Sequence, residues 1–247
     1  MIGIVDMDVL VYRSLAKQMK DGGNITEVFD DLLNNIEQGA ACDSYSYHLS
    51  GQGNFRKDLK QGFTKYKGKR KEKPELYEFL RNYVLKQYDC ISVPLFEADD
   101  TAAIEASNLR KEGKIYTLIT VDKDWQQVGG IWYNISYGSV KAISLNDGIK
   151  FFHRQLLIGD TVDNIPGLRS VGPKKADKAL EGQTLLQEIE TIEDMYKKVY
   201  KESSDEVLGH MGTMLWLKRS YDEPHWTPKR HKEYLNEVEK NNGSSQR

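Results

Sequence analysis

Short apolar runs alternate with segments of helical periodicity over the first 120 residues of the chain. Apolar runs over residues 2–5 and 115–120 predict strands, the first of them buried, and residues 45–49 and 90–93 are further strand candidates. Residues 25–36 and 97–111 show helical spacing. Pro74 is expected in the first turn of another helix, one face of which is lined by Leu76, Phe79, Leu80, Tyr83 and Val84. Strands that alternate with helices indicate an α/β protein with a parallel sheet covered on both faces.

The strand pattern ends at Asp147, and the rest of the chain is predicted to be helical. A glycine-bearing turn over residues 159–172 interrupts this part, and the polar stretch 239–247 is expected to fray. We therefore expect an α/β domain over residues 1–150 and a helical region over residues 151–247. The length of 247 residues agrees with this, since ~150 residues per domain gives fewer than two domains.

Composition argues against several classes of protein. No apolar run approaches the ~18 residues that predict a membrane span, and the first residues lack the basic region of a signal peptide. The only cysteines, Cys42 and Cys90, form no CxxC pair, so a disulfide scaffold and a zinc module are not expected. The sequence therefore predicts a soluble protein of a reducing compartment, the cytoplasm.

The formal net charge of −2 conceals a strong segregation of charge. Residues 55–75 contain nine basic and three acidic side chains, so this segment carries +6 and the remainder of the chain −8. Such asymmetry is expected of a protein that binds a polyanion and has an acidic site elsewhere. A lysine-rich surface loop without a ligand is the alternative.

Acidic residues stand where the predicted strands end or the predicted helices begin. They are Asp6, Glu97, Asp99, Asp100, Asp122, Asp124, Asp160 and Asp163. Each alone is explained by helix capping or by a turn. If they converge, carboxylates ~4 Å apart repel by roughly 4 kcal/mol per pair at an effective dielectric constant near 20, so cations must hold them together. Oxygen ligands select Mg²⁺ or Mn²⁺, and two such ions are used for in-line phosphodiester hydrolysis.

A second motif lies in residues 165–176, which predict a hairpin between helices. Gly167 and Gly172 are expected to allow close approach of the backbone, and Pro173 to begin the next helix. The N–H groups at that helix start suit a phosphate, and Lys174 and Lys175 add positive charge. An ordinary glycine-bearing corner between helices remains the alternative.

Five motifs occur in order over residues 2–180. They are Ile4-Val5-Asp6; Asn54-Phe55-Arg56 with Lys65-Tyr66-Lys67-Gly68-Lys69-Arg70; Glu97-Ala98-Asp99-Asp100; Thr120-Val121-Asp122-Lys123-Asp124; and Gly159 to Gly167 followed by Gly172-Pro173-Lys174-Lys175-Ala176. In this order they resemble the flap-endonuclease/5′-nuclease superfamily, and within it the small phage-encoded 5′→3′ exonucleases. The resemblance implies a PIN-like sheet flanked by helices and followed by a helix-hairpin-helix region.

The resemblance also implies roles for particular residues. The eight acidic residues above correspond to the carboxylates of a two-Mg²⁺ site that also accepts Mn²⁺, with Asp6 and Asp100 counted as catalytic. Lys67 and Arg70 would approach the scissile phosphate. DNA contacts would come from Arg56, Lys65, Lys67, Lys69, Arg70, Gly167, Gly172, Lys174 and Lys175, with K⁺ at the helix-hairpin-helix. The implied partner of a monomeric enzyme is duplex DNA with a 5′ end or flap, or an RNA–DNA hybrid, in the host cytoplasm of a phage.

The chain departs from the family pattern in three places. The family has an aspartate after the second strand, whereas residues 49–54 contain no acid. Asp8 is an additional acid, expected to lie behind the metal ligands. The segment between Arg70 and Cys90 has room for one helix only, and the C-terminal quarter, with Trp216 and Trp226, matches no part of the family pattern.

Two other classes of function remain open on the sequence. In a haloacid-dehalogenase-like phosphohydrolase, Asp6 would be a covalent nucleophile and Asp8 the general acid, which leaves the basic segment and the hairpin unexplained. In a catalytically relict protein that binds branched DNA, the missing acid near Ser50 would mark the lost activity.

Overall fold

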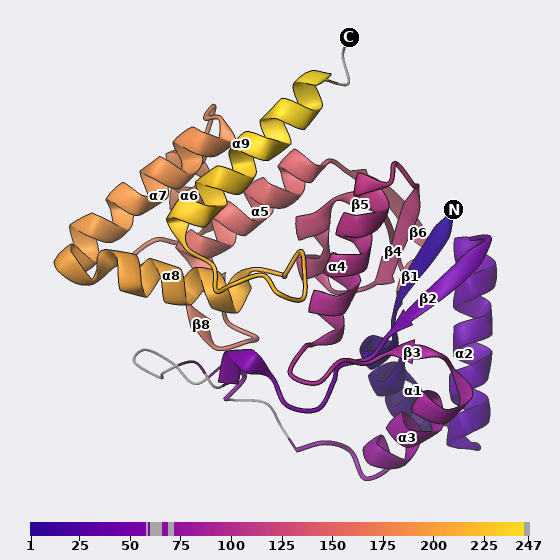
Figure 1. Cartoon of the computed structure of the whole chain (residues 1–247). Coiled ribbons are helices and arrows are strands. Elements are labelled where there is room, and N and C mark those ends of the chain that lie inside the picture. Colours follow the sequence, from indigo (N-terminus) through magenta and orange to yellow (C-terminus); the bar gives the residue numbers. More distant parts are fainter. Residues whose placement is uncertain (58, 60–65, 69–71, 245–247) are drawn as a thin grey trace. The chain divides into compact units, whose positions relative to one another are not determined.

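The computed structural model describes residues 1–57, 59, 66–68 and 72–244 (Figure 1). The chain forms two compact units. The sheet unit comprises Met1–Phe55, Lys71–Gly148 and Leu217–Tyr221, and the helical unit comprises Arg56–Arg70, Ile149–Trp216 and Asp222–Arg247. The predicted boundary at residue 150 stays a prediction.

The sheet unit is built on six strands. In chain order they are β1 (Ile2–Asp6), β2 (Ser44–His48), β3 (Cys90–Ile91), β4 (Tyr116–Thr120), β5 (Gly130–Asn134) and β6 (Ser139–Ile143). Their order across the sheet is β3-β2-β1-β4-β5-β6, and all neighbours are parallel except β5 and β6. The predicted parallel sheet is confirmed, and the antiparallel hairpin of β5 and β6 is an addition that the apolar pattern did not predict.

Helices cover both faces of this sheet. They are α1 (Met7–Asp21), α2 (Ile25–Ala40), α3 (Tyr77–Gln87), α4 (Ala98–Lys111) and the 3₁₀ segment η2 (Lys123–Val128). Successive strand residues point to opposite faces. Val5 accordingly packs in a cluster with residues of α1, α2 and α3, whereas Ile4 packs with residues of α4 and η2. The central strands β1 and β4 are thus buried on both sides, as their continuous apolar runs predicted.

The structure corrects two details of the helix after Pro74. Pro74 lies outside α3, and its carbonyl accepts a hydrogen bond of 3.0 Å from the Tyr77 N–H. Leu80 and Val84 are fully buried as expected, but Phe79 is 57% exposed. Helical spacing predicts a broad apolar face on this helix, but the tertiary packing decides which residues of that face are buried.

The helical unit contains most of α5 (Leu145–Ile158), then α6 (Pro173–Leu180), α7 (Leu185–Tyr200), the 3₁₀ segment η3 (Lys201–Ser203), α8 (Ser204–Leu215) and α9 (Pro228–Ser244). The short strands β7 (Gly159–Asp160) and β8 (Ile165–Pro166) pair between α5 and α6. The helical prediction for this region is confirmed. The expected fraying from residue 239 is wrong up to Ser244, because α9 continues to that residue.

Aromatic and histidine side chains fill the core of the helical unit. Phe152 contacts Trp216 and Trp226 at centroid distances of 4.8 and 5.6 Å. Beside them, His153 Nδ1 lies 2.7 Å from Glu188 Oε2, and His153 Nε2 lies 2.8 Å from His231 Nε2. The two tryptophans that matched no motif therefore form part of this core.

None of the helices within residues 1–57, 59, 66–68 and 72–244 has both the length and the apolar character needed to cross a membrane.

Candidate active site

Asp6 joins the end of β1 to the start of α1. Its Oδ1 accepts the Val9 N–H at 3.1 Å, which caps α1, and its Oδ2 accepts the Thr120 hydroxyl from the neighbouring strand β4 at 2.7 Å. Asp6 is only 2% exposed. Burial, followed by the charges of Asp8 and Asp122, raises the pKa of Asp6 to about 7 against the opposing effect of the two hydrogen bonds. Asp6 is therefore a carboxylate held in a fixed orientation among other acids.

Asp122 and Asp124 follow β4 at the start of η2. Asp122 caps this segment by accepting the Asp124 N–H at 2.9 Å, and its own N–H donates to Thr120 Oγ1 at 2.9 Å. The same threonine hydroxyl thus connects Asp122 to Asp6. The capping explanation for Asp122 is correct, and it places this residue at the carboxyl end of the sheet beside Asp6.

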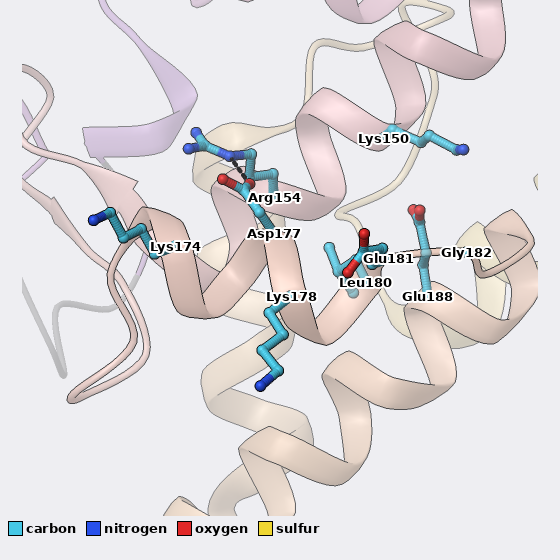
Figure 2. Close-up of a pocket in the computed structure, with 9 residues that line it drawn as sticks. All are labelled: Lys150, Arg154, Lys174, Asp177, Lys178, Leu180, Glu181, Gly182 and Glu188. Carbon is cyan, nitrogen blue, oxygen red and sulfur yellow. Dashed lines mark hydrogen bonds and ion pairs between the residues drawn. The ribbon is translucent and has the colours of Figure 1, made fainter.

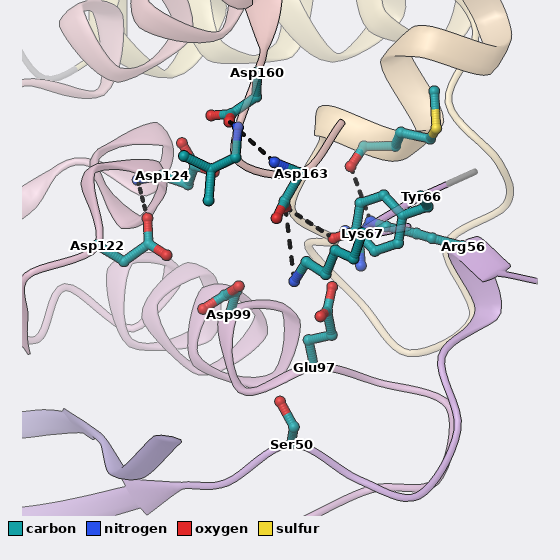
Figure 3. A network of polar contacts seen from close by, with 12 residues as sticks. Ser50, Arg56, Tyr66, Lys67, Glu97, Asp99, Asp122, Asp124, Asp160 and Asp163 are labelled. Atoms are coloured by element: carbon teal, nitrogen blue, oxygen red, sulfur yellow. Dashed lines mark hydrogen bonds and ion pairs between the residues drawn. The ribbon is translucent and has the colours of Figure 1, made fainter. Parts of the chain in front are cut away.

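The third acidic group begins α4, and Figure 3 shows Glu97 and Asp99 at the start of that helix. Glu97 is the N-cap residue, and its N–H donates to Asp100 Oδ2 at 3.4 Å in a capping box. Asp100 is fully buried and also accepts the Lys218 N–H at 3.3 Å. Asp99 accepts the Trp125 indole N–H at 2.7 Å. Within the sheet unit, helix starts therefore orient acids from three separate stretches of the sequence.

Asp8 forms a group with Ser50 that the sequence motifs did not predict. The Ser50 N–H donates to Asp8 Oδ2 at 3.1 Å, and the Ser50 hydroxyl donates to the same oxygen. Ser50 follows β2, at the place where the family pattern calls for an acid. Burial raises the pKa of Asp8, opposed by the Ser50 hydrogen bonds and the charge of Arg81, while Glu97 adds to the rise. The signal in the sequence was the spacing of Asp8 two residues after Asp6.

In the helical unit, Asp160 and Asp163 lie in one turn with two residues of the basic segment. Asp160 Oδ1 accepts the N–H groups of Val162 and Asp163 at 2.8 and 3.3 Å. Asp163 Oδ2 lies 3.6 Å from Lys67 Nζ and accepts the Tyr66 hydroxyl at 3.2 Å (Figure 3). The main chain adds a bond of 2.9 Å from the Lys67 N–H to the Asp163 carbonyl. Residues almost a hundred positions apart are thus brought together around one carboxylate.

Arg56 is located differently from the prediction. It is 3% exposed, and its Nε and Nη2 donate to the carbonyls of Met214 and Trp216 at 3.0 and 2.8 Å. These carbonyls end α8, where a cation complements the helix dipole. These contacts favour a structural role for Arg56, and its DNA contact stays a prediction. The predicted DNA contacts Lys65, Lys69 and Arg70 lie outside the described residues.

In the predicted hairpin, the backbone approaches another segment closely at one of the two glycines only. A Cβ atom on Gly167 would lie 2.3 Å from the Ile158 carbonyl carbon, so glycine is required there. A Cβ atom on Gly172 would have no neighbour within 4 Å, and the expected close approach at that position is wrong. Pro173 begins α6 as predicted, and Lys175 Nζ donates to the Ser170 carbonyl at 3.2 Å.

A hollow of about 670 Å³ lies beside α6 within the helical unit (Figure 2). Its lining includes Lys150, Arg154, Lys174 and Lys178, with acidic residues among them. Arg154 is paired with Asp177 at 2.5 Å. Lys174, one of the predicted DNA contacts, therefore lines a hollow of mixed charge, with four basic and three acidic side chains.

The donor atoms of the sheet unit suit a hard divalent cation. The charges of Asp8 and Asp122 both act on Asp6, and these three side chains offer oxygen ligands only. Among the residues that the structure describes, no three His, Cys, Asp or Glu side chains are grouped as a ready metal site. The chemistry of the donors fits Mg²⁺ or Mn²⁺, and the assignment of individual metal ligands stays a prediction.

No family model matches the chain, but comparison with known sequences finds similar proteins among DNA polymerases I and 5′-3′ exonucleases. It is 34% identical over 146 residues to DNA polymerase I of Rhizobium leguminosarum, which covers 51% of this chain and 14% of that protein. It is 28% identical over 172 residues to a 5′-3′ exonuclease of Buchnera aphidicola subsp. Acyrthosiphon pisum, which covers 63% of this chain and 56% of that protein. The chain thus spans less than two thirds of the length of both relatives.

Solved structures with a similar fold come from bacteriophage T5. The 5′-exonuclease with bound zinc ions aligns with a TM-score of 0.65 and 17% identity, over 87% of this chain and 88% of that one. A flap endonuclease complex with DNA and metal ions aligns with a TM-score of 0.58 and 15% identity, over 87% and 98% of the two chains. The resemblance of this chain to the 5′-nuclease superfamily is therefore confirmed, in sequence by the curated relatives and in fold by the T5 protein.

Proposed function

We propose that this chain is a divalent-metal-dependent 5′→3′ nuclease that hydrolyses phosphodiester bonds of DNA, as an exonuclease, a flap endonuclease or both. The observation that carries the proposal is the group of acids around Asp6. Two strand ends and two helix starts bring Asp6 and Asp122 together at the Thr120 hydroxyl, and the charges of Asp8 and Asp122 both act on Asp6. Repulsion of this kind opposes folding unless a cation relieves it, and carboxylate oxygens bind hard divalent ions.

The residues of the sheet unit would bind the metal. Asp6 and Asp122 are oriented by the Thr120 hydroxyl, and Asp99 by the Trp125 indole. Bound Mg²⁺, or Mn²⁺ in its place, would supply an activated water and polarise the phosphodiester. Two ions are proposed, because eight acids correspond to the family motifs. Asp100, proposed as one of these ligands, accepts the Glu97 and Lys218 N–H groups, which would orient it.

The helical unit would bind the DNA. Lys67 is held beside Asp163 and over the Tyr66 ring at 5.0 Å, which fixes its ammonium group for contact with a phosphate. Lys174 and Lys175, at the start of α6, would bind phosphates of the duplex, and K⁺ at the hairpin remains part of the proposal. Lys65, Lys69 and Arg70 are proposed as further contacts on sequence grounds alone.

The substrate would be duplex DNA with a 5′ end or flap, and RNA–DNA hybrids are included. The proposed enzyme acts as a monomer in the cytoplasm, where replication and primer removal supply such ends. Because phosphate contacts release condensed counterions, we expect the affinity for DNA to fall steeply with salt, with a slope of about −0.9 per neutralised phosphate on a double-logarithmic plot.

The test is cleavage of 5′-labelled duplex, nicked, flapped and RNA-primed substrates with Mg²⁺, Mn²⁺ or EDTA. We expect cleavage with either metal and none with EDTA, and at least a 100-fold loss for Asp6→Asn, given that losing one stabilising group at a reacting centre costs about 10²–10³. Equal cleavage in EDTA would refute the proposal. Binding without cleavage in both metals would favour a relict DNA-binding protein, and an acid-stable phosphoenzyme with a small phosphate ester would favour the phosphohydrolase.

A further inference from the structure

Asp8 lies in the first turn of α1, but its carboxylate binds a residue outside that helix. Asp6, not Asp8, caps α1. Asp8 instead accepts both donors of Ser50, a residue of the loop after β2. Its carboxylate is therefore turned away from its own helix start and toward the neighbouring strand end.

Ser50 is itself firmly held, which fixes the carboxylate that it binds. Its hydroxyl accepts the Ala98 N–H at 3.0 Å, and its carbonyl accepts Arg81 Nη2 at 2.6 Å. Figure 3 shows Ser50 close to the start of α4, where Glu97 lies. The contacts of Ser50 thus connect Asp8 to the helix that carries Glu97 and Asp99.

Geometry places the same carboxylate near the proposed metal ligands. Asp8 stands two residues after Asp6 at the start of α1, and its partner Ser50 is bonded to the N–H of Ala98, the neighbour of Glu97. At the end of β2, the loop of residues 49–54 contributes no acid. Asp8 supplies a carboxylate to this place from α1, and Ser50 orients it.

We propose that Asp8 is a metal-binding carboxylate of this chain and that Ser50 is the residue that positions it. The inference rests on the proposed nuclease function, since it assigns a ligand to that metal site. It replaces the expectation that Asp8 lies behind the ligands. It also means that the missing acid after β2 is compensated from another element and does not mark a lost activity.

The experiment measures Mn²⁺ binding directly, by isothermal titration calorimetry and by electron paramagnetic resonance of the free ion, without DNA. We expect Asp8→Asn to lose one bound ion or to weaken one site at least tenfold, since even residues that only orient metal ligands change affinity 10–100-fold. The matched control is Asp21→Asn on the same helix, where Asp21 is exposed. It should bind Mn²⁺ within twofold of the wild type.

A transfer of the carboxylate separates ligation from a structural role. Asp8→Ser should weaken Mn²⁺ binding as Asp8→Asn does. In the double variant Asp8→Ser/Ser50→Asp, the acid returns to the end of β2 with the hydroxyl as its partner. The Mn²⁺ affinity should then recover to within about fivefold of the wild type, a smaller change than the 10–100-fold loss expected without the carboxylate. A structural role predicts no recovery of metal affinity in the double variant.

The outcomes distinguish the inference from the function on which it rests. If the wild type binds no Mn²⁺, the metal-dependent function fails and the inference with it. If the wild type binds but Asp8→Asn binds equally, the inference is wrong and the proposed function stands. Should Asp8→Asn fail to fold, as judged by circular dichroism, a folded double variant that binds like the wild type supports the inference, and one without Mn²⁺ affinity overturns it.

Discussion

The clearest conflict between sequence and structure concerns Arg56, and it leads to a quantitative prediction. The motif predicts a DNA contact, whereas the structure shows the guanidinium donating to two carbonyls at the end of α8. Replacing Arg56 with methionine keeps an unbranched apolar stem and removes both donors. Each buried carbonyl left without a donor costs about 1–3 kcal/mol, so we expect the free energy of unfolding to fall by about 4 kcal/mol.

Thermal and urea denaturation measure this loss. For a chain of this size, about 2–4 °C per kcal/mol corresponds to a fall of about 8–16 °C in Tm for Arg56→Met. Arg56→Lys keeps the charge near the helix end but has one donor group in place of two, so about half of the loss is expected. Lys57→Met is the matched control, because Lys57 is the exposed neighbour and should change stability by less than about 0.5 kcal/mol.

The DNA-binding role makes the opposite prediction for the same variants. If Arg56 contacts a phosphate, Arg56→Met should leave stability near that of the control and reduce the salt slope of DNA binding by about one. An unchanged Tm combined with this smaller slope would therefore refute the structural role. Binding is compared at 10 °C, well below the expected Tm of each variant, so that unfolding does not enter the result.

Three further predictions address glycine, histidine and tryptophan positions. Gly167→Ala should destabilise by about 2 kcal/mol or more in urea denaturation, because its Cβ would meet backbone, whereas Gly172→Ala should be neutral; equal effects would contradict this. Burial lowers the pKa of His153, so at low pH the unfolded state takes up a proton that the folded state does not. The free energy of unfolding should keep its full value above about pH 6.5 and fall by up to ~1.4 kcal/mol per pH unit below it. His153→Gln should reduce this slope. Trp125→Phe frees Asp99 from its indole donor and should weaken Mn²⁺ binding about tenfold in calorimetry, and an unchanged affinity would rule out that orienting role.

Strand positions were predictable where burial is complete on both faces. The apolar runs located β1 and β4 to within one residue, since parallel strands between two helix layers admit few polar side chains. β2 was located as closely, although most of its side chains are only half-buried. β6 was missed because its first four residues are exposed and leave no apolar pattern. α1 was missed although Met7, Leu10, Val11 and Leu15 have helical spacing, because the helix follows β1 without a loop.

The site was predictable in the residues that motifs name and not in their partners. The acids at strand ends and helix starts lie where the patterns put them. The carbonyls that accept from Arg56 come 158 and 160 residues later in the chain, and no local pattern encodes such a contact. Ser50 was noticed only as a missing acid, because its bond to Asp8 crosses 42 residues.

The capping and metal-binding explanations for the acids prove to be compatible. Asp6, Glu97 and Asp122 each cap a helical segment. A carboxylate has about four acceptor positions, so one N–H bond fixes its orientation and leaves others for a ligand. Each helix start also carries roughly half a positive charge, which lowers the repulsion among crowded acids before any cation binds. The N–H groups that make these residues look like ordinary caps are therefore what allows several like charges to be held at one edge of the sheet.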